Sequence, residues 1–280
     1  MAVTVNIETI TPEMAKAMLE GNTGNFRNVD RSRVIRYAAD MKAGRWPVTG
    51  DSVKFNGQQL KDGQHRLIAC VRSGVPFDTV VAKNVQDDAV LNIDRGKPRS
   101  VGQWLRHLGV PSYNAAAAIS RSAICYDKGL WAHHSWGAET TTDIEVIEYA
   151  KKHQQSIHSA YKTAARQNLV TKTILGTILH IGCGRGDATN DAVCKWFAER
   201  LADGIDLQST DPVWLLRNRF EKENRGLKKT TPFLQRQLAT KAWNSTVKGE
   251  ELTSLFMRFT GPTKTKPIKV ILTTEDSNAS

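Results

Sequence analysis

The hydrophobic and polar positions of the first hundred residues switch between two periods, which predicts short strands separated by helices. Residues 4–10 (TVNIETI) alternate with a period of two and are rich in β-branched side chains, as in a strand. Two more short strands are predicted within residues 51–63 around Asn56-Gly57, a dipeptide typical of tight hairpins, and another over residues 77–85. Helices are predicted over residues 12–20, 31–44, 63–74 and 101–109.

Thr11 and Asp30 stand where helix caps are expected, and Pro12 suits the first position of a helix. From about Pro111 the apolar residues recur at helical spacing, which predicts helices over residues 114–129, 142–152, 191–204 and 231–249. Thr142 and Glu145 have the spacing of a capping box. Residues 267–280 (PIKVILTTEDSNAS) predict one strand and a polar tail.

The pattern as a whole predicts an α+β fold in which an α+β domain precedes a mostly helical one. We place the first domain at residues 1–110, the helical domain at 111–262, and the possible strand and flexible tail at 263–280. No apolar run approaches the ~20 residues that span a bilayer, and the N-terminus lacks the pattern of a signal peptide. We therefore expect no membrane partner and a cytoplasmic protein.

Charge changes this picture by suggesting a partner. The 280 residues include 39 Lys and Arg against 28 Asp and Glu, a formal net charge of +11. This excess of positive charge predicts a polyanionic binding partner, and DNA is the expected one. The basic residues gather in four segments: Arg27–Arg36, Arg95–Arg106, Arg217–Lys229 and Lys264–Lys269.

The positions of the four cysteines predict structural thiols rather than a metal site or a catalytic site. No CxxC pair is present, and His180 and Cys183 have a metal-like spacing without a second pair of ligands. We interpret the cysteines as buried structural thiols. The GCGRG run at residues 182–186 predicts a turn that ends a helix.

The candidate chemistry lies in residues 60–74, LKDGQHRLIACVRSG, where a strand meets a helix. The start of a helix carries unpaired N–H groups and a partial positive charge, so it attracts phosphate. Gly63 lacks the side chain that would block an anion, and Gln64 can hydrogen-bond in either direction. Arg66, one turn into the helix, can hold phosphate oxygens in a bidentate manner.

Asp62 and His65 leave two interpretations open. His65 can move a proton or stabilise charge near neutral pH, and Asp62 can hold Mg²⁺ beside a phosphate, as in a phosphotransferase, an NTPase or a nuclease. Alternatively, Asp62 caps the helix, Gly63 tightens the turn, and His65 and Arg66 are solvated. A loop at residues 94–100 offers Arg95 and Arg99 as a second phosphate contact, or it is a solvated turn.

The motif resembles the ParB/sulfiredoxin superfamily over roughly residues 5–105. Gly63, Arg66 and Ala69 match the Gly-x-x-Arg-x-x-Ala skeleton of the ParB nucleotide-binding motif. Gly63, His65 and Arg66 match the Gly-Cys-His-Arg of sulfiredoxins, and DGQHR matches proteins associated with DNA phosphorothioation and deazaguanine systems. The resemblance implies a ParB/sulfiredoxin-like N-terminal domain and a phage or mobile-element origin. It also places Trp46 near the pocket, where Trp46 covers a base or packs in the core.

Two departures narrow what the resemblance implies. Gln64 replaces the catalytic cysteine of sulfiredoxins, which excludes sulfinic acid reduction by that route, and the arginine run of ParB is reduced to His65 and Arg66. We expect a nucleotide- or metal-dependent enzyme acting on or near DNA, a nuclease or NTPase, with Mg²⁺ and a nucleoside triphosphate as cofactors. The alternatives are a DNA-binding regulator that senses nucleotide without turnover and a small-molecule kinase. We also consider that the protein could form a homodimer.

Overall fold

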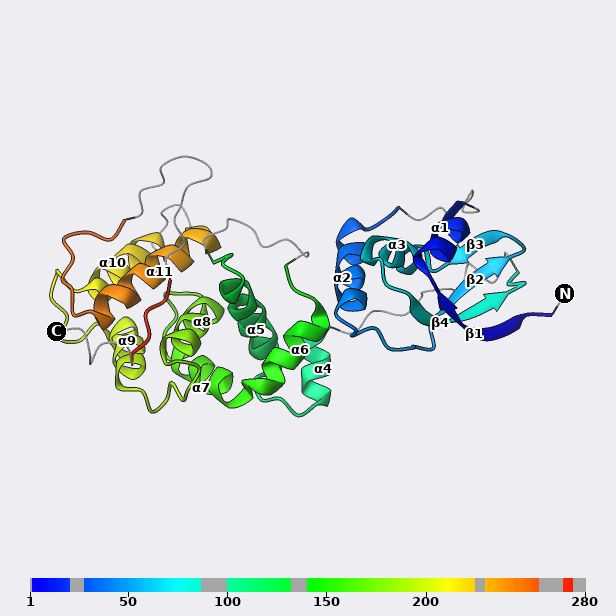
Figure 1. The fold of residues 1–280 in the computed structure, drawn as a ribbon. Coiled ribbons are helices and arrows are strands. Elements are labelled where there is room, and N and C mark those ends of the chain that lie inside the picture. The colour runs from blue at the N-terminus through cyan, green and yellow to red at the C-terminus, as the bar shows by residue number, and fades with distance from the viewer. Residues whose placement is uncertain are drawn as a thin grey trace. The chain divides into compact units, whose positions relative to one another are not determined.

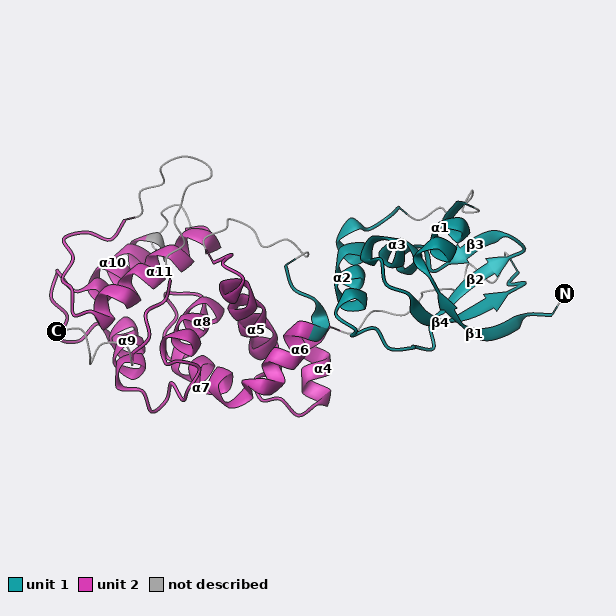
Figure 2. Cartoon of the chain, in the orientation of Figure 1, with its two compact units in different colours: residues 1–98, 137–144 teal, residues 99–136, 145–280 magenta. Residues whose placement is uncertain are grey.

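The structure, a computed structural model, describes residues 2–20, 28–86, 100–131, 140–224, 230–256 and 269–273. The chain divides into a first unit, residues 1–98 with 137–144, and a second unit, residues 99–136 with 145–280 (Figures 1 and 2). The first unit holds a mixed sheet with helices, and the helices of the second follow it along the chain. The predicted α+β class is confirmed at this level.

The first unit is built on a four-stranded sheet in the order β1-β4-β2-β3. The strands are β1 (Thr4–Ile10), β2 (Ser52–Asn56), β3 (Gln59–Asp62) and β4 (Phe77–Lys83). The β1–β4 and β2–β3 pairs are antiparallel, whereas β2 and β4 are parallel. All four predicted strands are confirmed, and Gly57 adopts φ +57° in the predicted turn between β2 and β3.

Three helices pack with this sheet: α1 (Pro12–Glu20), α2 (Arg31–Lys42) and α3 (Gln64–Ser73). Their predicted starts are confirmed. Thr11 Oγ1 accepts from the Met14 N–H at 3.3 Å, and the Asp30 carboxylate accepts from the Arg33 N–H at 3.1 Å. Side chains from the three helices and from the sheet form one apolar cluster, made of Ile10, Ala15, Val34, Ala38, Met41, Val53, Phe55, Leu60, Leu67, Ala69, Cys70, Phe77 and Val81.

Gly63 forms the junction between β3 and α3. Its φ is +101°, a conformation that side chains with a Cβ rarely adopt. A Cβ at this position would lie 3.0 Å from both γ carbons of Val53 on β2. The glycine therefore allows α3 to begin directly against the sheet.

The later helices are α4 (Val101–His107), α5 (Tyr113–Asp127), α6 (Asp143–Lys152), α7 (Gln154–Ala164), α8 (Lys172–Gly182), α9 (Ala192–Asp203), α10 (Pro212–Asn224) and α11 (Pro232–Val247). Helix α8 is buried from Ile174 to Gly182. At its end, Gly182 lies against the Trp243 ring of α11, which leaves no room for a side chain. Within the described residues, no helix is long and apolar enough to cross a membrane.

Three features differ from the sequence analysis. Helices α7, α8 and α10 were not predicted. Helix α4, which we placed in the first domain, groups with the second unit because Val101 and Leu105 pack in a cluster with residues of α5, α6 and α7. The described residues of the predicted C-terminal strand, 269–273, are not a strand. They are held instead by α11, where the Asn244 side chain bonds the Lys269 carbonyl at 2.7 Å and the Ile271 N–H at 2.9 Å.

We predict that Gly63→Ala destabilises the protein far more than Gly57→Ala. Both positions have positive φ, which costs an alanine ~1–2 kcal/mol. Only Gly63 also forces a Cβ against Val53, and such overpacking adds ~1–3 kcal/mol, whereas space is open at Gly57. Urea unfolding of the two variants measures the difference. Equal losses of unfolding free energy would show that the contact with Val53 is not a constraint.

Candidate functional site

The motif residues lie at a corner where the start of α3 meets the start of β2 and the end of β3. Arg66 reaches from α3 to the backbone of this corner. Its Nη1 donates to the Asp51 carbonyl at 2.6 Å, and its Nη2 donates to the Ser52 carbonyl at 2.8 Å. The side chain is 12% exposed. The guanidinium therefore fastens β2 to α3, and it is not the solvated group of the structural alternative.

Asp62 is surrounded by cations. Its Oδ2 lies 2.8 Å from Nζ of Lys54, its partner in the β2–β3 register, and 3.7 Å from Nη2 of Arg66. Its Oδ1 accepts from the Gly63 N–H at 2.7 Å. Gly63 is the N-cap residue of α3 and no side chain caps this helix start, so the predicted cap function of Asp62 is wrong. A cation bound at Asp62 would compete with Lys54.

His65 and Gln64 occupy the first turn of α3 with different environments. The Nε2 atom of His65 accepts from the Asp30 N–H at 2.9 Å, which joins the start of α2 to the start of α3. The Arg33 N–H in turn holds the pKa of Asp30 below its usual range. The side-chain oxygen of Gln64 is buried and has no hydrogen-bond partner among the described residues. A buried acceptor without a donor is uncommon and calls for an explanation.

The corner therefore brings together Asp62, Gly63, Gln64, His65 and Arg66, with Lys54 as an addition that the sequence analysis missed. Arg95 and Arg99, the predicted second phosphate contact, lie outside the described residues. Trp46 packs edge-to-face against Tyr37 and Phe77, with ring centroids 4.8 and 6.5 Å apart. These contacts support core packing for Trp46 rather than contact with a base.

The cysteines match their structural interpretation. Cys70, Cys125 and Cys194 are buried and Cys183 is half-buried, and all four are free thiols. Burial raises the pKa of Cys70 to about 11. Among the described residues, no three His, Cys, Asp or Glu side chains are grouped so that they could hold a metal ion. Asp62 is therefore not part of such a group in the described part of the chain.

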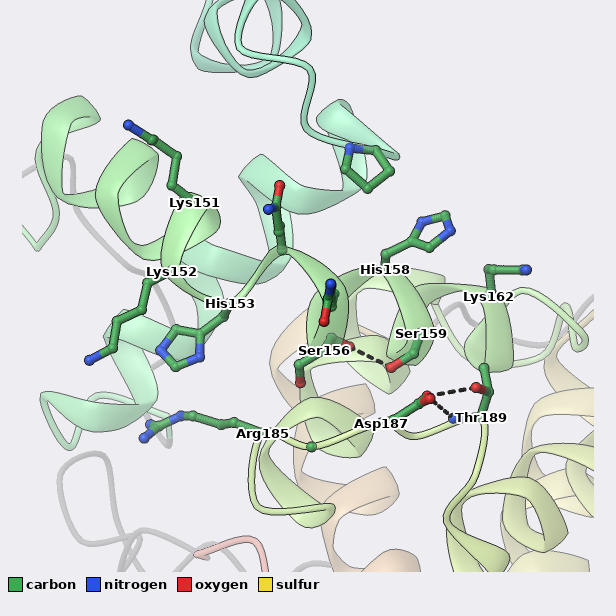
Figure 3. Close-up of a pocket in the computed structure, with 14 residues that line it drawn as sticks. Lys151, Lys152, His153, Ser156, His158, Ser159, Lys162, Arg185, Asp187 and Thr189 are labelled. Atoms are coloured by element: carbon green, nitrogen blue, oxygen red, sulfur yellow. Dashed lines mark hydrogen bonds between the residues drawn. The ribbon is translucent and has the colours of Figure 1, made fainter.

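A second feature, absent from the sequence analysis, is a cavity of about 630 Å³ in the second unit (Figure 3). We call it the basic pocket. Its lining comes from the end of α6, one face of α7 and the turn after α8: Pro111, Lys151, Lys152, His153, Gln154, Gln155, Ser156, His158, Ser159, Lys162, Arg185, Gly186, Asp187 and Thr189. The Lys151-Lys152-His153 run was visible in the sequence as a signal. Its pairing with Arg185 depends on the fold.

A chain of polar groups runs beneath the basic pocket. His180, fully buried on α8, contacts the Ser156 hydroxyl with Nδ1 at 2.7 Å and the Tyr149 hydroxyl with Nε2 at 3.0 Å. Burial, with repulsion from His153 and Arg185, lowers the pKa of His180 to about 3. Burial also raises the pKa of Tyr149 to about 12. Both groups are therefore neutral at pH 7.

Comparison of the chain with models of known families, with curated proteins and with solved structures gave no match in any of the three. The resemblance to the ParB/sulfiredoxin superfamily therefore stays a prediction from the motif residues. The structure adds the geometry of the corner to those residues. The comparisons give no relative from which a function can be transferred.

We predict that His180 makes the protein less stable as the pH falls below about 6.5. Between about pH 6.5 and 3, this histidine is protonated in the unfolded chain but neutral in the folded protein. The free energy of unfolding therefore falls by roughly 1.4 kcal/mol for each pH unit in this range. Unfolding free energies between about pH 6 and 5 measure this slope. His180→Gln should remove this component of the slope, while His107→Gln, at an exposed position, should retain it. A wild-type slope in His180→Gln would contradict the assignment.

Proposed function

We propose that the first unit binds phosphate groups at the start of α3, and that the protein is a ParB/sulfiredoxin-like nucleotide-binding protein acting on or near DNA. The observation that carries this proposal is the corner itself. Two cationic side chains, Lys54 and Arg66, converge there on one carboxylate oxygen beside a helix N-terminus. A phosphate is bound by the same combination of charge-assisted donors and helix N–H groups.

The unpartnered Gln64 oxygen supports a nucleotide rather than a bare phosphate. It is a buried acceptor in the first turn of α3, and a donor from a ligand would satisfy it. The ribose hydroxyls of a nucleotide are donors of this kind. In this proposal Arg66, Lys54 and the start of α3 hold phosphate, and Gln64 accepts from the sugar.

We rank binding without turnover above catalysis because of Asp62. An Mg²⁺-dependent nuclease or NTPase needs this carboxylate for the metal, whereas Asp62 is paired with Lys54 at 2.8 Å. The same enzyme would use His65 to shuttle a proton, and the Nε2 atom of His65 is engaged by the Asp30 N–H. These contacts favour a regulator that senses nucleotide. A small-molecule kinase would need the same metal and gains no support from them.

The net charge of +11 supports DNA as the macromolecular partner. We predict duplex binding with weak sequence preference and a steep dependence on salt. Each neutralised phosphate should contribute about −0.9 to the slope of log affinity against log salt concentration. Fluorescence anisotropy with two unrelated duplexes over a range of salt concentrations measures this slope. Affinity that is unchanged between low and moderate salt would count against DNA.

We predict that substitutions of the two partners in the Lys54–Asp62 ion pair change nucleotide affinity in opposite directions. Lys54→Met removes a charge-assisted contact to phosphate worth ~1.5–3 kcal/mol, so affinity should fall about 10- to 100-fold. Asp62→Asn removes a repulsive charge and releases Lys54, so affinity without metal should rise. Calorimetric titration with nucleoside triphosphates in the absence of Mg²⁺ measures both changes.

Lys61→Met is the matched control for Lys54→Met, because Lys61 is on β3 next to Asp62 but donates to Gln59 at 2.9 Å. It should bind like the wild type. Equal affinities for all four proteins would refute phosphate binding at the corner. Nucleotide hydrolysis and DNA nicking are assayed with Mg²⁺ on the same proteins. If the wild type is active and Asp62→Asn is inactive but melts at the same temperature, the protein is an enzyme rather than a regulator.

A further inference from the structure

The basic pocket has cationic groups on two sides and hydroxyl groups between them. Figure 3 shows Lys152, His153 and Arg185 on one side, His158 and Lys162 on the other, and Ser156 and Ser159 between. The lysines are exposed. α6 and α7 are consecutive in the chain, and the fold brings the turn after α8 to them.

The lining has a surplus of positive charge. Among the described lining residues, four cations (Lys151, Lys152, Lys162 and Arg185) accompany one carboxylate, Asp187. Arg185 is also paired with Asp127 outside the lining, so the three lysines are the cations that exceed the carboxylates. The Asp187 carboxylate is already engaged, since it accepts from the Thr189 hydroxyl at 2.6 Å and from the Asn190 amide at 2.8 Å. Such a surplus favours an anionic ligand, because a bound anion relieves the repulsion among the cations.

Ser156 lines the basic pocket, and the fully buried His180 contacts its hydroxyl group. The contacts run from Tyr149 through His180 to Ser156. When the proton of neutral His180 is on Nδ1, the Ser156 hydroxyl accepts from it and keeps its own proton for another acceptor. Ser156 also lies in the first turn of α7, where helix N–H groups lack partners within the helix.

Arg185 is held in an unfavourable backbone conformation. Its φ is +65°, which costs a residue with a Cβ about 1–2 kcal/mol. Its guanidinium carbon lies 6.0 Å from the centre of the Tyr149 ring and its side chain forms an ion pair with Asp127. Arg185 lines the cavity, whereas Tyr149 and Asp127 do not, so these contacts hold Arg185 from outside the cavity. Strained residues of this kind concentrate at binding sites.

We propose that the basic pocket binds a small ligand with two or more linked phosphate groups, either free pyrophosphate or the oligophosphate part of a nucleotide. A phosphate group carries about −1.5 to −2 charges at neutral pH, and cations stand on two sides of the cavity, so two linked groups allow a contact on each side. The volume of about 630 Å³ is that of a small-molecule site and too small for a duplex. The lining contains no Trp, Tyr or Phe on which a base could stack, so recognition rests on the phosphates.

The test uses the full chain and the double variant Lys152→Gln/Lys162→Gln, with Lys172→Gln/Lys222→Gln as the matched control. The control removes two exposed lysines of the same unit that do not line the cavity. Calorimetric titration with pyrophosphate and with ATP should show binding to the wild type and the control. The pocket variant should bind at least about tenfold more weakly. Similar losses in the variant and the control, or no binding to the wild type, would overturn the proposal.

Hydrogen exchange measured by mass spectrometry separates this site from the α3 corner. Protection by pyrophosphate in peptides covering residues 153–159 and 185–189 supports the proposal, with or without protection at residues 62–67. Protection by ATP at the same peptides assigns the bound group to a nucleotide as well. Protection at residues 62–67 alone would support the proposed function and refute this inference. Protection of the pocket peptides by a DNA duplex but not by pyrophosphate would also refute it.

Discussion

The close contact between Gly63 and Val53 is the constraint on which the first unit depends. Because Gly63 has φ +101° and no Cβ, the first turn of α3 lies against β2 with no spacer. That approach brings the Arg66 guanidinium to the Asp51 and Ser52 carbonyls at the start of β2. Asp62, the last residue of β3, then lies between Lys54 and Arg66. The glycine at this motif position is therefore required by packing, before any ligand is considered.

The parts of the fold that could be predicted from the sequence are those with local causes. Asn56-Gly57 indicates the hairpin, and Thr11 and Asp30 mark helix starts through bonds that span three residues. Helix α8 was missed because it is buried on all sides, so it has no polar face to reveal its period. The break between α6 and α7 is a single residue, His153, which leaves no loop for a pattern to detect.

The sites depend on long-range pairing, and this limits what sequence can reveal. The five motif residues are adjacent in the chain, so their grouping followed directly. Lys54 joined them only through the β2–β3 register, and the role of His65 only through its contact with Asp30, 35 residues away. The basic pocket depends still more on the fold, since α7 and the turn after α8 must pack together before Arg185 and Lys152 line one cavity. A single sequence carries no sign of that arrangement.

The two sites also differ in what a bound phosphate would have to displace. At the α3 corner, the protein itself compensates the cations: Lys54 is paired with Asp62, and Arg66 is held by two backbone carbonyls. A ligand must replace those bonds, and His65 connects the same turn to the start of α2. The proposed binding there would be costly and coupled to the packing of two helices, which suits a sensor. In the basic pocket the lysine charges exceed the nearby carboxylates, so a ligand relieves repulsion instead. That arrangement suits a site that holds its ligand without rearranging the fold.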